Sequence, residues 1–185
     1  QSLLWIGLLG GFVVALITIF VKKAAPYTAP LYALLEGLVI GGISAMFETQ
    51  FEGITTQAIL LTLGTLLSLL FAYRSGWIKV TENFKLGVFA ATGAIFFVYI
   101  ADLILRFFGM GVPFIHETGP IGIIISVVIV IVAALNLVLD FDFIEEGVKQ
   151  QAPKYMEWYG AFGLMVTLVW LYLEILRLLS KIRSK

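Results

Sequence analysis

The chain has 185 residues, of which 61% are apolar and 13% charged, and it carries 12 basic and 12 acidic residues but no cysteine. Polar groups this scarce cannot cover the apolar surface in water, so the composition excludes an ordinary soluble protein and indicates an integral membrane protein with the lipid bilayer as its surroundings. The balanced charge argues against nucleic-acid binding, and the lack of cysteine excludes disulfides and thiolate metal sites.

Six segments are long and apolar enough to cross a bilayer as helices, since one span needs about 20 residues. The connections between them are short and polar, which favours antiparallel neighbours in one bundle. We therefore predict an all-α polytopic transmembrane helix bundle, with a single transmembrane domain over residues 1–185. In chain order the predicted spans are Ser2–Val21, Pro30–Phe47, Ile54–Tyr73, Leu86–Phe108, Pro120–Phe143 and Tyr155–Leu179.

The basic residues of the loops predict the orientation. The second and fourth connections carry none, whereas the first, third and fifth carry Lys22, Lys23, Arg74, Lys79, Lys85, Lys149 and Lys154, which places these three loops in the cytoplasm. The tail with Lys181, Arg183 and Lys185 does not fit this rule if the last segment crosses completely. Either the tail is external, or the last segment is re-entrant.

Small residues at four-residue spacing predict close helix contacts inside lipid. Such a spacing joins Gly37 to Gly41 in the second segment, and Gly64 and Gly87 belong to similar patterns in the third and fourth segments. We expect these three segments to be packed core helices.

Acidic side chains within the spans are the candidates for function, because a charge at membrane depth costs roughly 2.5–3.5 kcal/mol even on the lenient insertion scale. Asp102 and Glu174 have ordinary explanations, since Arg106 and Arg177 follow them at spacings that form ion pairs on one helix face. Glu36 has no base within one turn, so it must face the bundle interior, be protonated or pair with another helix.

Asp140 and Asp142 end the fifth apolar segment and project about 200° apart on a helix, so they cannot chelate one ion together. Asp142 is expected to form an acidic rim at the membrane surface with Glu145 and Glu146, either as a solvated helix end or as an ion entrance. Asp140 lies a turn deeper. A carboxylate there is poorly solvated when charged, so it is suited to binding cations or sensing protons.

No catalytic motif is present, and we predict neither an enzyme nor a bound cofactor. His116 is the only histidine and is expected to be an ordinary loop residue, because no second histidine or cysteine completes a zinc site. Whether the acidic groups hold a metal is left open.

The runs Ala29–Gly37, Asn136–Ile144 and Ala152–Tyr159, and the last segment rich in Leu-Tyr-Leu-Glu-Ile-Leu-Arg, resemble the bacterial YccA-like branch of the Bax inhibitor-1 family. The resemblance implies a seven-helix bundle in the bacterial cytoplasmic membrane, with the first helix before Gln1. It also implies a pH-sensitive calcium leak gated by two acids on the last two helices. Asp140 matches the first acid, and either Glu174 or Thr167 takes the second position.

Two functions follow from these observations. The first is a cation pathway, with Ca²⁺ as the permeant ion, gated by protonation of Asp140 and held by a basic latch at Lys22 or Lys23. The second is a non-conducting accessory protein that binds another membrane complex, for example an FtsH-type protease. Because Glu174 lies about 10 Å along the helix from Thr167, we predict that it pairs with a base and that Asp140 has a different partner.

Overall fold

The computed structural model describes residues 2–110 and 117–184, and within these ranges the secondary structure is helical throughout, as predicted. Five of the helices are long and apolar enough to cross a membrane, and α1 is a shorter apolar helix over Leu4–Phe20. The helices are α1 (Ser2–Phe20), α2 (Ala25–Gln50), α3 (Ile54–Arg74), α4 (Glu82–Phe107), α5 (Pro120–Lys149) and α6 (Tyr155–Arg183), with a 3₁₀ turn at Lys22–Ala24.

Helices α2 to α6 extend beyond the apolar segments that predict them, and the extension is largest in α2 and α5. Helix α2 begins before Pro30 because Pro26 occupies its first turn, where a missing backbone N–H leaves no helical hydrogen bond unmade. Helix α5 continues past Phe143 to Lys149, since polar residues prolong a helix beyond the apolar segment without breaking its backbone hydrogen bonds. Asp140 therefore lies well inside α5 rather than at its end.

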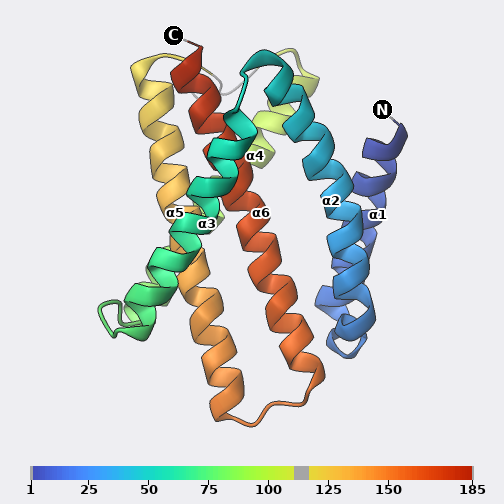
Figure 1. The fold of residues 1–185 in the computed structure, drawn as a ribbon, viewed down its shortest axis with the longest axis vertical. Coiled ribbons are helices and arrows are strands. Elements are labelled where there is room, and N and C mark those ends of the chain that lie inside the picture. The colour runs from blue at the N-terminus through green and yellow to red at the C-terminus, as the bar shows by residue number, and fades with distance from the viewer. Residues whose placement is uncertain (1, 111–116, 185) are drawn as a thin grey trace.

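Helix α6 is the central element of the bundle and packs against α2, α3 and α5 (Figure 1). It is continuous over Tyr155–Arg183, without a break at which a re-entrant segment would turn back, and the C-terminus lies at the end opposite the α5–α6 turn. The largest apolar core lies along this helix and comprises Ala58, Ala133, Leu137, Phe141, Leu171, Tyr172, Ile175 and Leu176.

The small residues pack differently from the prediction. Gly37, Gly41, Gly64 and Gly87 face open space, since an added Cβ would meet no atom within 4 Å. The close contact is instead made by α1, where a Cβ on Gly7 would lie 2.8 Å from the carbonyl oxygen of Leu35 on α2. Helices α2 and α3 pack against α6 as expected of core helices, but the prediction that they do so through these glycines is wrong, because glycine spacing alone does not show which helix approaches it.

Candidate functional site

Asp140 projects from α5 into the seam between α5 and α6. An added Cβ on Gly163 of α6 would lie 3.6 Å from its Oδ1, and the Thr167 hydroxyl, one turn farther along α6, is the hydrogen-bond partner of the carboxylate. The Oδ2 atom is enclosed by protein and has no hydrogen-bond partner among the described residues. Buried polar atoms in folded proteins usually have a hydrogen-bond partner, so this oxygen marks Asp140 as the candidate group of the site.

The local sequence creates this position. Leu137 and Phe141 are buried on the side of α5 that faces the core, and Asp140 lies beside them on the same helical stripe. Gly163 has no side chain, so α6 leaves room for the carboxylate where another residue would fill the seam. Thr167 supplies a short polar group of neutral charge. The site thus holds one carboxylate and one hydroxyl.

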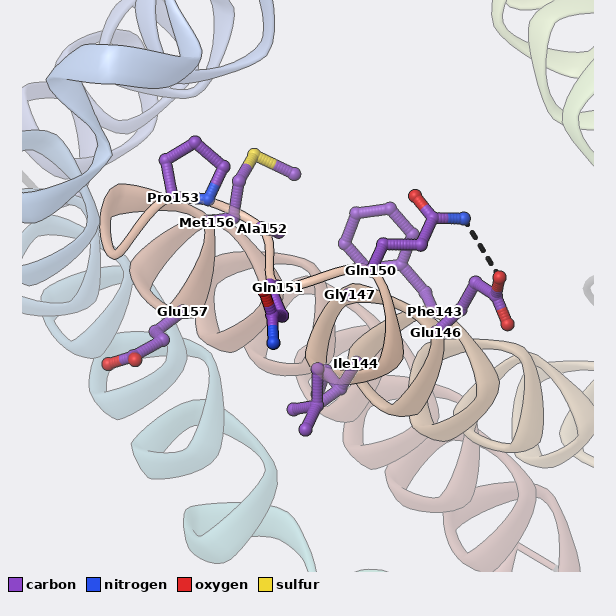
Figure 2. A pocket seen from close by; sticks show the side chains of 11 residues that line it. Phe143, Ile144, Glu146, Gly147, Gln150, Gln151, Ala152, Pro153, Met156 and Glu157 are labelled. Carbon is purple, nitrogen blue, oxygen red and sulfur yellow. Dashed lines mark hydrogen bonds between the residues drawn. The ribbon is translucent and has the colours of Figure 1, made fainter.

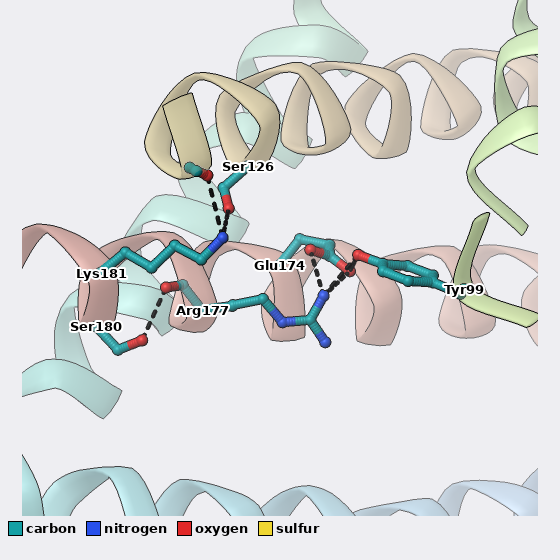
Figure 3. A network of polar contacts seen from close by, with 7 residues as sticks. Tyr99, Ser126, Glu174, Arg177, Ser180 and Lys181 are labelled. Atoms are coloured by element: carbon teal, nitrogen blue, oxygen red, sulfur yellow. Dashed lines mark hydrogen bonds and ion pairs between the residues drawn. The ribbon is translucent and has the colours of Figure 1, made fainter. Parts of the chain in front are cut away.

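Glu174, the other candidate for the second acid, lies in a separate network (Figure 3). Its carboxylate accepts hydrogen bonds from the Tyr99 hydroxyl at 2.7 Å and from Arg177 Nη1 at 3.0 Å, and its residue surface is only 2% exposed. Arg177 also donates to the Tyr99 oxygen and lies against its ring. The prediction that Glu174 pairs with a base, and Asp140 with another group, is confirmed.

The same end of the seam holds a buried lysine, Lys181, which the sequence analysis assigned to the C-terminal tail. Lys181 Nζ donates to the Gly122 carbonyl at 3.0 Å and to Ser126 Oγ at 2.8 Å, both on α5 (Figure 3). No sequence signal distinguished this lysine from its exposed neighbours, because its burial depends on the register of α5 against α6. Asp102 and Arg106 of α4 form the predicted pair at 2.9 Å.

The predicted acidic rim is present, but its carboxylates have partners. Lys85 Nζ of α4 lies 2.9 Å from Asp142, and the Tyr73 hydroxyl of α3 donates to Glu145 at 2.6 Å. Lys149 also binds Glu145, and the Gln150 amide donates to Glu146. The rim connects α3, α4 and α5 at the predicted membrane surface, so one of its roles is to hold these helices together.

Glu36 and the two latch candidates lie on the other side of α6. Glu36 is half-buried on α2 beside Gly11 of α1 and is hydrogen-bonded by Tyr32. Lys22 Nζ lies 5.3 Å from the centroid of the Tyr159 ring, a cation–π contact. Within the described part of the chain, neither Lys22 nor Lys23 forms an ion pair with Asp140, and the latch stays a prediction.

The described residues contain no group of three or more acidic or histidine side chains arranged to hold a metal ion. His116, predicted to be an ordinary loop residue, lies outside the described residues. Asp140 with its single hydroxyl neighbour offers too few ligands for a tightly bound divalent ion, because Ca²⁺ takes six to eight oxygens. The geometry suits transient contact with a cation or a proton.

Long apolar helices packed around a central one define a multi-pass membrane protein. The profile of the family described as Bax inhibitor 1 like matches residues 1–184. The chain therefore belongs to the Bax inhibitor 1 like family. No curated protein and no solved structure showed a significant match to it.

Proposed function

We propose that this protein is a passive cation pathway, with calcium as the permeant ion, and that protonation of Asp140 gates it. The main support is the Asp140 carboxylate itself, which is held at membrane depth with Oδ2 unpartnered. A chain that keeps such a group in a span usually uses it for ions or protons. The family resemblance supports the same function, and a multi-pass protein of the bacterial cytoplasmic membrane without enzymatic activity is the setting we propose.

The surroundings of Asp140 favour a particular sign for the gating. A neutral carboxyl group fits the closed seam, since it needs only the Thr167 hydroxyl and an apolar wall. An ionised carboxylate leaves a charge without a counter-ion, which favours the entry of water and cations. Acid therefore closes the pathway in this proposal, and ionisation opens it.

The other charged groups around the site have partners of their own, so Asp140 is the group left to respond. Lys85 of α4 binds Asp142, and Glu145 is held by Tyr73 of α3 and by Lys149. These groups lie at the surface end of the seam. A latch formed by Lys22 or Lys23 would give the opposite sign, because acid would break its pair with Asp140 and raise the flux.

Calcium flux into liposomes containing the purified protein tests the proposal. Wild-type flux is expected to rise with pH, while Asp140→Asn, which cannot ionise, is expected to give low flux that no longer depends on pH. Asp142→Asn, two residues away in the rim, is the matched control and should keep the wild-type profile. The same pH profile in wild type and Asp140→Asn would overturn the proposal.

A second function is favoured by the open glycines of α2. Gly37 and Gly41 line a mostly apolar groove of about 490 Å³ between α2, α3 and α6, and an added Cβ on either would meet no atom of the described residues within 4 Å. Small residues let a foreign helix approach closely. An accessory protein that binds another membrane complex, such as an FtsH-type protease, would use this face and need not conduct.

Extraction in a gentle detergent separates this second function from the first. A co-purifying membrane subunit is expected, and Gly37→Leu combined with Gly41→Leu should remove it by filling the groove. Gly87→Leu on α4 is the control, since that glycine is also open but lies outside the groove. Recovery of the protein without any subunit would count against an accessory role.

A further inference from the structure

The turn between α5 and α6 encloses a pocket of about 480 Å³ that the proposed function does not yet use (Figure 2). Its lining includes the polar residues Glu146, Gln150, Gln151 and Glu157, so water can enter it. The rest of the wall is apolar and includes Ile144 at the inner end.

The shape of the pocket is fixed by the way α5 ends. The Ala152 N–H donates to the Gly147 carbonyl at 2.9 Å and the Gln151 N–H donates to the Val148 carbonyl at 3.1 Å. Gln151 adopts the left-handed conformation, φ 51°, that usually falls to glycine after a helix of this kind. The backbone hydrogen bonds hold the pocket open between the two helix ends.

The inner end of the pocket lies one helical turn from Asp140 on both helices. On α5, Ile144 follows Asp140 by four residues, and on α6, Gly160 precedes Gly163, which faces the carboxylate, by three. A Cβ on Gly160 would lie 2.9 Å from Ile144 Cγ1, so this side chain is pressed against the α6 backbone. The contact of Ile144 with Gly160 thus lies between the pocket lining and the turn that carries the acid.

The opposite direction along the seam is closed more completely. Leu137 and Leu171 belong to the apolar core and are 0% exposed, whereas Ile144 is 37% exposed and lines the pocket. Hydrophobic constrictions control the passage of water and ions in membrane proteins. The thinner barrier is therefore the one at the turn.

We propose that the pocket at the α5–α6 turn is the aqueous entrance to Asp140, and that the contact of Ile144 with Gly160 is the barrier that closes it. Water and protons enter between the helix ends and reach the carboxylate when Ile144 moves off the α6 backbone. This inference deepens the proposed gating at Asp140, but it concerns access to the acid and does not require that any ion crosses the membrane.

The cysteine-free chain permits a direct test with single cysteine reporters. Thr167→Cys places a thiol beside Asp140, and Ala152→Cys places one in the pocket wall. The purified variants, in lipid nanodiscs, are treated with a small charged methanethiosulfonate, and the modified fraction is followed by intact-protein mass spectrometry. The pocket thiol should react promptly and the Thr167→Cys thiol slowly. Adding Ile144→Ala should speed the latter by about tenfold or more, a change of ~1.4 kcal/mol in the barrier.

Val148→Ala is the matched control, because it removes an apolar side chain from the same pocket wall one turn nearer the end of α5. It should leave the Thr167→Cys thiol slow. Ile144→Val, which loses one methyl group, should give a smaller acceleration and serves if Ile144→Ala lowers the melting temperature. Prompt reaction of Thr167→Cys with Ile144 in place, or no acceleration by either variant, would overturn the inference whatever the flux experiment shows.

Discussion

Two acids lie along the same pair of helices, and their surroundings differ in kind. Near the α5–α6 turn, Asp140 has one neutral hydroxyl as partner and an oxygen with none. Toward the other end, Glu174 accepts hydrogen bonds from Tyr99 and Arg177. A buried charge with its partners in place contributes to the architecture, whereas one without them is unstable unless something arrives to neutralise it. The contrast separates a structural end of the seam from a responsive one.

The largest effect is expected at the structural end. Glu174→Ala leaves Arg177 without its carboxylate and Tyr99 without its acceptor, and it should lower the free energy of unfolding by about 3 kcal/mol. Denaturant-induced unfolding in detergent micelles measures this. Glu157→Ala, at an exposed position on the same helix, is the control and should change little. Equal losses from the two variants would show that the network is dispensable.

Lys181→Met should have the next largest effect, about 2 kcal/mol of lost stability, because hydrogen bonds from a charged donor are stronger than neutral ones. Methionine keeps an unbranched stem but cannot donate to the Gly122 carbonyl or to Ser126. The same unfolding measurement applies, with Lys154→Met at an exposed position as the reference. If Lys181→Met left the free energy of unfolding unchanged, the buried methylene chain of Lys181 would matter for stability and its hydrogen bonds would not.

At the Asp140 end of the seam, the predicted change in the free energy of unfolding has the opposite sign. Asp140→Asn removes the costly ionised form and should raise stability by about 1 kcal/mol at about pH 8, with the gain shrinking toward about pH 5 because protons compete for the charge of any carboxylate. Unfolding curves at both pH values measure the difference. If Asp140→Asn destabilised the protein as Glu174→Ala does, both acids would stabilise the fold and the contrast between the two ends of the seam would be wrong.

The smallest effect is expected in the rim. The side chains of Lys85 and Asp142 are 34% and 26% exposed, and partly exposed pairs of this kind contribute about 0.5 kcal/mol. A double-mutant cycle of Asp142→Asn and Lys85→Met should give a coupling of that size, which falls when salt is added. A coupling above about 2 kcal/mol would mean that the Lys85–Asp142 pair stabilises the fold as the Glu174 network does.

Patterns within one helix were predictable from the sequence. The six apolar segments match the helices because span length is a local property, and Glu174 with Arg177 follows from spacing on one face. The choice between Glu174 and Thr167 as neighbour of Asp140 was partly predictable too. The rise per residue places Glu174 too far along α6, and the structure puts Thr167 opposite the acid.

Relations between helices were not predictable. Tyr99 and Ser126 gain their roles from the register of α4 and α5 against α6, which leaves no trace in the spacing of residues. The glycines illustrate the same limit. Gly37 and Gly41 show the expected pattern but face open space, while Gly7 of α1 makes the close contact. A pattern identifies a face that permits approach and does not identify the partner.

The central position of α6 also has a consequence for biosynthesis. A ribosome makes this helix after the other five, and its polar side chains would be costly to insert alone. Their partners are already in the membrane by then, because Tyr99 belongs to α4, while Gly122 and Ser126 belong to α5. Arg183 likewise finds the carbonyl of Glu52, which is made much earlier. Each buried charged side chain of α6 can therefore form its hydrogen bonds as soon as the helix is inserted, because the helices that carry its partners are made first.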